Sequence, residues 1–387
     1  MSKLKKRNSK IIWIILAILV FVLVTPWGRT FYKTLIILPE FIPNSPIKTI
    51  NLLTPTPQIK EVEFKSQDKT IFADLYLPKT RGKYPAAVLH LGVDIDRKDE
   101  RIQKLANVSA RSGIATLVPN IPSLHNRRVL TETKDDLISS FDYLKSQPNI
   151  NKKKLGFIGF CASGGLVILA AEDLKINDQV NFIVAVNPYY DLKSLYKNIT
   201  LRQIEDEGKI ISWQPHFKTV EIYNRETINA LEREKDKEIL NKHLTFIDQA
   251  LFETGKFGSL SQSELIQLTQ EAKFTYESLT NKDQDKVSYY LEKATSDQKK
   301  LLEELSPSTN LDKLKAKIFI LMDKNNIYIP YTEAKLLDKA LLEKDHLFAE
   351  TKILPTGDLT QHLPSKDYVG ETLKIFRFLY SVLLEIT

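Results

Sequence analysis

The sequence contains a single cysteine, Cys161, among 387 residues. One cysteine excludes an intramolecular disulfide framework and argues against a cysteine-ligated metal site. The sequence also lacks internal repeats and low-complexity stretches, while its apolar fraction of 43% is ordinary for a folded protein. We therefore expect a globular protein of one or two domains that needs no metal and no organic cofactor.

Acidic residues are missing from the first 39 positions, and this gap accounts for the net charge of +7. Seven basic residues precede the first acidic residue, Glu40, and the rest of the chain is electrically neutral. A charge excess confined to one end indicates a membrane surface rather than nucleic acid, so we expect no nucleic-acid partner. The seven basic residues are Lys3, Lys5, Lys6, Arg7, Lys10, Arg29 and Lys33.

Residues 11–27 carry no charge and are apolar apart from Thr25. Extended to Gly28, the run has 18 residues, which is at the short end of what spans a bilayer. A cleaved signal peptide is the alternative, but residues 25–28 lack the usual small-x-small cleavage site. We expect an uncleaved single-pass transmembrane helix, with the basic end cytoplasmic and the remaining chain extracytoplasmic.

The chain divides into an anchor, a tether, a core and an insertion. Residues 1–28 hold the basic end and the anchor, and residues 29–58 are punctuated by prolines and predict a semi-extended tether. Residues 59–191 and 310–387 alternate between strand and helix patterns, which predicts a mostly parallel sheet with helices on both faces. Residues 192–309 interrupt this alternation.

Short apolar runs and amphipathic stretches define the expected elements of the core. An antiparallel hairpin is expected first, over residues 61–65 and 70–77, around a polar turn. Further strands are expected at residues 85–91, 114–118, 155–160, 181–186, 316–322 and 349–354, and helices at 101–112, 131–146, 164–171, 332–342 and 368–384.

The interrupting residues 192–309 show no strong strand pattern, and glycine occurs there only at positions 208, 255 and 258. Apolar residues recur at helical spacing, as in Leu240, Leu244, Ile247 and Leu251. The sequence therefore predicts a helical insertion. One interpretation is that the insertion is a structural appendage. We favour the interpretation that it forms a cap that covers a functional site.

Residues 155–165, LGFIGFCASGG, carry the clearest chemical signal in the chain. A buried strand ends at Phe160 and a buried helix follows, with small residues two positions before and after Cys161. This pattern is typical of a nucleophile elbow, a sharp strand-to-helix turn that exposes its nucleophile at the helix N-terminus. We expect the helix dipole to favour a thiolate at Cys161. A buried inert cysteine and a shifted frame with Ser163 as nucleophile are the alternatives.

With these residues the chain resembles the α/β-hydrolase superfamily, and within it the dienelactone-hydrolase-like branch. The resemblance covers about residues 59–387 and is carried by FADLYLP at residues 72–78, by the GFCASGG turn and by Ile329-Pro330-Tyr331. It implies an α/β-hydrolase fold, with nucleophile, acid and histidine in that chain order. It also implies a small-molecule acyl substrate.

The resemblance assigns roles to further residues. His362, in a loop before the final helix, would be the base, and the backbone N–H groups of Ala162 and Val93 would form the oxyanion hole. The family usually has aspartate four residues before the proline of Ile-Pro, where this chain has Asn326. Asp323, three residues earlier, is another candidate acid, as is Asp191 after the preceding strand.

The sequence thus predicts a membrane-anchored hydrolase of carboxylic esters, lactones or thioesters that works through an acyl-cysteine. Asparagine at the acid position suits a cysteine nucleophile better than a serine, because a thiol ionises more readily. An acyltransferase would share the acyl-enzyme step. The alternative from another class is a catalytically degenerate hydrolase-fold protein that binds a ligand or partner at the cell surface.

Overall fold

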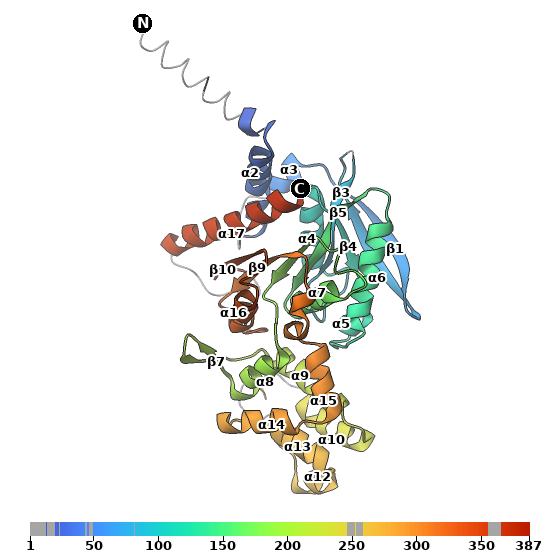
Figure 1. Ribbon diagram of the computed structural model, residues 1–387, viewed down its shortest axis with the longest axis vertical. Coiled ribbons are helices and arrows are strands. Elements are labelled where there is room, and N and C mark those ends of the chain that lie inside the picture. The colour runs from blue at the N-terminus through green and yellow to red at the C-terminus, as the bar shows by residue number, and fades with distance from the viewer. Residues whose placement is uncertain are drawn as a thin grey trace.

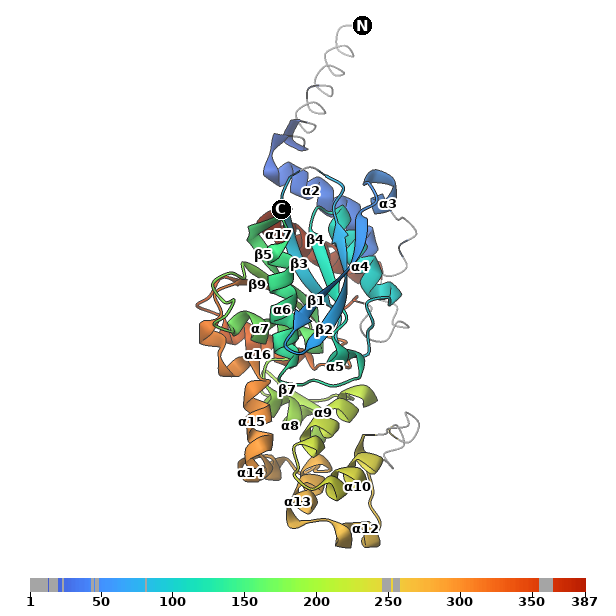
Figure 2. The same cartoon turned by 90° about the vertical axis from the view of Figure 1, so that its right-hand side faces the viewer.

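The computed structural model describes residues 24–42, 45, 49–80, 82–245, 258–354 and 365–387, together with residues 13, 20–22 and 252. A central sheet lies in the middle of the molecule, with helices on both of its faces (Figure 1). The insertion extends from one end of the sheet, and the N-terminal helices lie at the other end (Figure 2).

The central sheet has eight strands in the order β1-β2-β4-β3-β5-β6-β9-β10. Strands β1 and β2 form the predicted hairpin, and β2 pairs antiparallel with β4; the remaining pairs are parallel. The predicted mostly parallel sheet is therefore present. The strands are β1 (Gln58–Ser66), β2 (Lys69–Leu77), β3 (Tyr84–His90), β4 (Ala115–Pro119), β5 (Ile150–Phe160), β6 (Phe182–Val186), β9 (Lys317–Asp323) and β10 (His346–Thr351).

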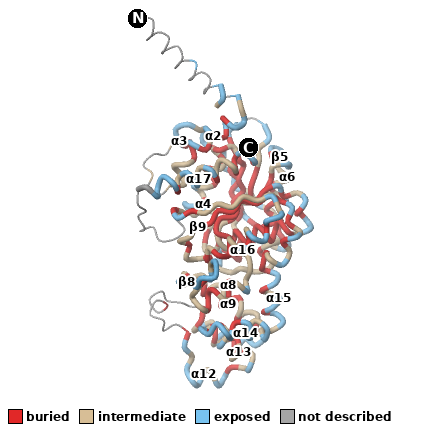
Figure 3. The backbone as a smooth tube through the Cα atoms, turned by 60° about the vertical axis from the view of Figure 1, so that its left-hand side comes forward, coloured by how far each residue is buried: buried red, intermediate tan, exposed pale blue. Residues whose placement is uncertain are grey.

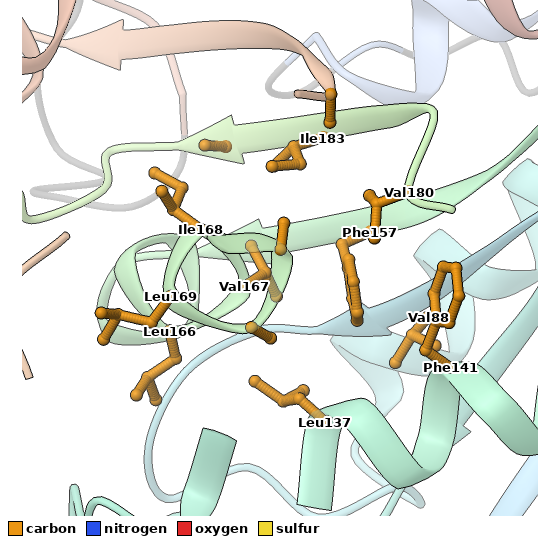
Figure 4. Packing of buried hydrophobic residues seen from close by; sticks show 14 of the residues in the cluster. Val88, Leu137, Phe141, Phe157, Leu166, Val167, Ile168, Leu169, Val180 and Ile183 are labelled. Atoms are coloured by element: carbon orange, nitrogen blue, oxygen red, sulfur yellow. The ribbon is translucent and has the colours of Figure 1, made fainter. Parts of the chain in front are cut away.

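Two helical layers cover the sheet and bury its central strands (Figure 3). One layer contains α6 (Thr133–Ser146), α7 (Ala162–Glu172) and α16 (Tyr331–Ala340), and the other contains α4 (Glu100–Arg111) and α17 (Ser365–Ile386). Helix α7 is apolar on every side because β5, β6 and α6 surround it, and Figure 4 shows Val167 and Ile168 packed beside the strand residues Phe157 and Ile183. The sequence analysis did not predict a further short helix, α5 (Pro122–His125).

The predicted tether is mostly helical and packs on the core. Helix α2 (Pro26–Ile37) continues into the 3-10 turn η1 (Leu38–Glu40), and α3 (Thr49–Leu53) follows. Thr25 caps α2, and Pro26 occupies its first turn, where a missing N–H costs nothing. Ile36, Ile37 and Ile50 are buried in one hydrophobic cluster with residues of α17. The segment is therefore not extended, and it packs on the core. Its apolar residues gain more by joining the core than by staying in solvent.

Most of the predicted transmembrane segment, residues 11–27, lies outside the described residues. Within the described part of the chain, no helix is both long enough and apolar enough to cross a bilayer. Helix α2 runs through the expected anchor boundary at Gly28 without interruption.

The insertion is mainly helical, as predicted, but it also contains a β-hairpin that the sequence analysis missed. Strands β7 (Gln203–Asp206) and β8 (Lys209–Ser212) pair around Glu207 and Gly208, which both have positive φ angles. Two residues with positive φ form the tight turn that suits a hairpin. The helices of the insertion are α8 (Leu192–Leu201), α9 (Phe217–Asn229), α10 (Glu234–Leu244), α12 (Gln262–Gln267), α13 (Gln270–Leu279), α14 (Val287–Lys293) and α15 (Ser296–Glu304), with 3-10 turns η2 (Gln284–Lys286) and η3 (Pro307–Thr309). The 3-10 turn η4 (Leu311–Lys313) follows at the start of the second core segment.

Candidate active site

Cys161 lies at the sharp turn between β5 and α7, at the carboxyl edge of the sheet. Its backbone has φ 50° and ψ −122°, a strained conformation for a residue with a side chain. The Cys161 N–H donates to the Val186 carbonyl at 2.9 Å, which fixes the turn to the neighbouring strand β6. A Cβ atom on Gly159 would lie 2.5 Å from the Ser163 carbonyl oxygen, so only glycine fits there. This is the geometry of a nucleophile elbow.

The two predicted oxyanion residues lie beside the elbow. Ala162 is the first residue of α7, so its N–H has no acceptor within the helix. Gly92 has φ 111°, and a Cβ there would lie 3.7 Å from the Cys161 Cβ and 4.0 Å from the Ala162 nitrogen. Val93 follows directly and lines the same cavity as Cys161 and Ala162. The loop after β3 thus brings its backbone over the elbow, where a substrate oxygen would lie.

Ser163, the alternative nucleophile, is fully buried and does not line the cavity. Its Oγ lies 2.9 Å from Nδ1 of His90, and the Gly92 N–H donates to the same nitrogen at 3.2 Å. Because Nδ1 accepts from Gly92, the Ser163 hydroxyl donates to it. Burial lowers the pKa of His90 to about 4, so this imidazole is neutral. The pair ties α7 to the oxyanion loop, a positioning role that the sequence analysis did not find for His90.

Asn326, at the position of the missing acid, contacts the nucleophile itself. Its Oδ1 accepts the backbone N–H groups of Tyr328 at 2.8 Å and Ile329 at 2.9 Å, which orients the amide. The side-chain amide forms a hydrogen bond with the Cys161 thiol. Asn326 is buried, so this contact is shielded from solvent.

The other two candidate acids have structural partners. Asp323 ends β9, and its carboxylate accepts the backbone N–H groups of Asn325 at 2.9 Å and Leu354 at 3.0 Å. Burial raises the pKa of Asp323 to about 6. Asp191 caps helix α8 by accepting from Lys193 and Ser194. Asp323 therefore joins the loop after β9 to the chain segment after β10, whereas Asp191 stabilises the start of the insertion.

The pKa of the Cys161 thiol differs from the lowered value that the sequence analysis expects. Burial raises the pKa of Cys161 to about 11, and the hydrogen bond from Asn326 only partly opposes this effect. The partly buried Cys161 packs against a hydrophobic cluster that includes Tyr189, Leu195 and Ile329, an apolar environment that disfavours a thiolate more strongly than a helix terminus favours it. With the described residues alone considered, Cys161 is therefore a neutral thiol at physiological pH.

His362, the predicted base, lies outside the described residues, as does the rest of its loop at residues 355–364. Its role stays a prediction. The start of that loop is fixed, because Leu354 donates its N–H to Asp323 and lines the cavity that contains Cys161.

A single cavity of about 640 Å³ surrounds the elbow. Its size lies within the range of small-molecule sites, about 300–1,000 Å³. The core contributes one part of its wall and the insertion another, through helices α8, α9 and α15. Among the lining residues are Phe41, Leu91, Val93, Leu105, Val108, Phe160, Cys161, Leu192, Leu195, Ile222, Tyr223, Leu301, Leu302, Leu305, Tyr328 and Leu354.

The insertion also holds the loop that carries Asn326. Trp213 donates its indole N–H to the Asn326 carbonyl at 3.3 Å, and Thr219 donates its hydroxyl to the Tyr328 carbonyl at 2.9 Å. The His216 N–H donates to the Ile327 carbonyl at 2.8 Å. The insertion thus both lines the cavity and fixes a residue that contacts the nucleophile.

Side chains able to bind a metal are not grouped in the parts of the protein that the structure describes. No three histidine, cysteine, aspartate or glutamate side chains there could hold one ion together. The chemistry that the described site offers is therefore a thiol, two backbone N–H groups and an amide, which together suit acyl transfer.

Comparisons with known proteins agree with this geometry. Residues 78–254 match the model of the dienelactone hydrolase family, a range that includes the oxyanion loop and Cys161 but ends before Asn326 and His362. A relative of uncharacterized function from Pseudomonas aeruginosa is 28% identical over 148 residues, which are 35% of this chain and 38% of that protein.

A solved structure shares the fold. An acylaminoacyl peptidase bound to a chloromethyl ketone is 13% identical with a TM-score of 0.50, and covers 87% of this chain and 42% of its own. The acylaminoacyl peptidase of Pyrococcus horikoshii in an orthorhombic crystal form is 13% identical, with a TM-score of 0.49 and the same coverage of both chains. The chain spans less than half the length of these relatives. The match to the dienelactone hydrolase family covers residues 78–254, which is less than half of the chain.

Proposed function

We propose that the protein hydrolyses a carboxylic ester, lactone or thioester through a covalent acyl-Cys161 intermediate. The observation that carries this proposal is the position of Cys161 at a strained elbow, in a cavity that also receives Ala162 and the Val93 loop. Ser163 is a poor candidate, because it is fully buried and does not line the cavity.

The reaction would proceed in two steps. The Cys161 sulfur attacks the substrate carbonyl carbon, a C–S bond forms, and the oxygen is stabilised by the N–H groups of Ala162 and Val93. The C–O or C–S bond of the substrate then breaks, and the leaving group takes up a proton. Water next attacks the acyl-cysteine, which releases the acid and returns the proton to the thiol.

A base is required in this scheme. Because the pKa of Cys161 is raised to about 11, the thiol gives up its proton only when a neighbouring group accepts it. We propose His362 for this role. It would receive the thiol proton in the first step and give it to the leaving group. Asn326 would stabilise the developing thiolate through its amide N–H.

Trapping of the intermediate tests the proposed function. Short incubation with p-nitrophenyl butyrate, followed by acid quench, should leave one butyryl group on the peptide that contains Cys161. Neutral hydroxylamine should remove it, since a thioester is far more sensitive than an oxygen ester. Peptide mapping by mass spectrometry checks both results. A butyryl group on Ser163, or turnover without any adduct under saturating ester, would contradict the cysteine mechanism.

We also propose that the protein is held at a membrane by residues 11–27, with its catalytic domain outside the cytoplasm. The uncharged run and the basic residues before it support this orientation. Helix α2, which continues the run, exposes apolar and aromatic side chains of the kind found at membrane interfaces. These side chains are Trp27, Phe31, Tyr32 and Leu35.

Fractionation of cells that express the full chain tests the membrane proposal. The protein should sediment with membranes at full length, and protease added to spheroplasts should digest the domain. A soluble form that lacks the first 25 to 30 residues would instead indicate a cleaved signal peptide. Full protection from protease in intact spheroplasts, with digestion after lysis, would reverse the orientation.

A further inference from the structure

We infer that the cavity binds a long, uncharged acyl chain and that the N-terminal segment around η1 closes its far end. The inference names the substrate class of the site described above. It rests on the proposed function for the bond that is cleaved, but not for the binding of the chain.

The wall of the cavity away from the insertion carries a row of apolar side chains that begins at the nucleophile, together with the charged side chains of Glu40, Asp94, Arg101 and Lys104. Phe160 precedes Cys161 directly and packs with residues of α4 and with the end of the N-terminal segment. Leu105 and Val108 line the cavity along successive turns of α4, and Phe41 lines it just after η1. An acyl chain attached to Cys161 could therefore follow α4 toward Phe41 in contact with these apolar side chains.

The charged side chains that line the cavity are all paired within the described structure. Lys104 lies 3.4 Å from Glu40, Lys218 lies 2.6 Å from Asp94, and Arg101 lies 2.7 Å from Asp99. The remaining one, Glu226, forms an ion pair with Arg128. A substrate that carries its own charge would have to compete with these partners for the charged side chains. The lining therefore suits a neutral apolar group rather than a small dicarboxylate or a phosphate.

The N-terminal segment has a function in this arrangement that a tether would not have. The Lys104–Glu40 pair joins η1 to α4 across the cavity wall, and Ile36 and Ile37 anchor the segment in the core. Phe41 then limits how far a chain can extend. Each methylene buried before that limit should raise kcat/KM about fourfold, and methylenes beyond it should add nothing.

Direct binding separates this inference from catalysis. In Cys161→Ala, which leaves an ester intact, the neutral fluorescent probe N-phenyl-1-naphthylamine should bind in the cavity. Methyl dodecanoate should displace it at concentrations at least about 50-fold lower than methyl butanoate, because more methylenes are buried. Equal displacement by the two esters, or no binding of the probe, would overturn the inference whatever the activity of the wild-type protein.

Chain-length profiles locate the chain within the cavity. With p-nitrophenyl esters below their critical micelle concentrations, Leu105→Trp should lower kcat/KM for the dodecanoyl ester about 60-fold, equivalent to about three methylenes, and change the acetyl ester less than threefold. Phe41→Ala should move the optimum to longer chains. Gln103→Trp is the matched control, because Gln103 is on the same helix, partly exposed and not part of the lining, and it should leave the profile unchanged.

The possible results distinguish the two proposals. If the methyl esters bind as expected but no ester is hydrolysed, the proposed function fails and the acyl-chain site remains. If esters are hydrolysed with no preference for length, or with a profile that Leu105→Trp and Phe41→Ala do not change, the inference fails and the hydrolase remains. Thermal unfolding of each variant should show that the substitutions leave the fold intact.

Discussion

Cys161→Ala is expected to reduce kcat/KM for an activated ester by about 10⁴-fold or more, whereas Ser163→Ala should stay within about tenfold of the wild-type value. The difference follows from the structure, in which Cys161 lines the cavity and Ser163 is sealed beneath it against His90. Loss of the Ser163 hydroxyl removes one buried hydrogen bond, which should cost about 1 kcal/mol of stability. Steady-state kinetics and thermal unfolding measure the two effects separately.

Cys161→Ser is the control for this pair, because it keeps the shape of the side chain and replaces only the sulfur. Its hydroxyl is a far weaker acid than a thiol, and a neighbouring amide activates it little, so activity should stay low while the melting temperature is unchanged. Activity in Cys161→Ala together with inactivity of a folded Ser163→Ala protein would contradict the assignment and make serine the nucleophile.

Much of the core could be predicted from the sequence, because its signals are local. Alternating apolar residues define β2, and a glycine two positions before Cys161 identifies the elbow before any contact is known. The observed ends of some helices and strands differ from the predicted ends where the sequence pattern was incomplete. Helix α7 begins at Ala162 rather than at Gly164, and β10 ends at Thr351 rather than at residue 354.

The N-terminal segment could not be predicted in the same way. Its prolines indicated a semi-extended tether, but Pro39 lies in the first turn of the helical element η1, where proline is tolerated. Whether such a segment stays in solvent or packs on the core depends on the apolar surface of α17, which lies more than 300 positions away in the chain. Sequence patterns do not carry that information.

The contacts of the candidate site residues could not be predicted from the sequence. Asn326 was expected to stand at the position of the acid, and in the structure its amide contacts Cys161. The thiol was expected to ionise readily because of the helix terminus, but the apolar residues around it come from the insertion and from the loop after β9, so its burial follows only from the tertiary fold. The hydrogen bonds from Trp213 and Thr219 to the Asn326 loop likewise join distant segments.

The second large effect concerns Asn326 and the pH at which Cys161 reacts. In the wild-type protein, alkylation by iodoacetamide should be slow at pH 7 and should accelerate about tenfold for each pH unit toward the pKa of about 11, because only the thiolate reacts. Among the described residues, Asn326 provides the one hydrogen bond that opposes the effect of burial, so in Asn326→Ala the thiol pKa should rise further and alkylation at a fixed pH should slow about tenfold. Cys161 is the only thiol, so the label reports on it alone.

Asn326→Asp should have the larger effect, since it places a carboxylate against the sulfur. Two negative charges in one buried site disfavour each other, so both alkylation at pH 8 and ester hydrolysis should fall by about 100-fold. Asn325→Asp is the matched control, because its side chain instead bonds the Lys352 carbonyl at the surface, and it should change neither rate more than about threefold. Higher activity in Asn326→Asp would show that this position acts as the acid behind His362, and rapid alkylation of the wild-type protein at pH 7 would show that His362 outweighs burial. If instead both rates fall together in Asn326→Asp and in Asn326→Ala, the amide is what stabilises the thiolate, and aspartate is disfavoured there because the partner of this side chain is the sulfur itself.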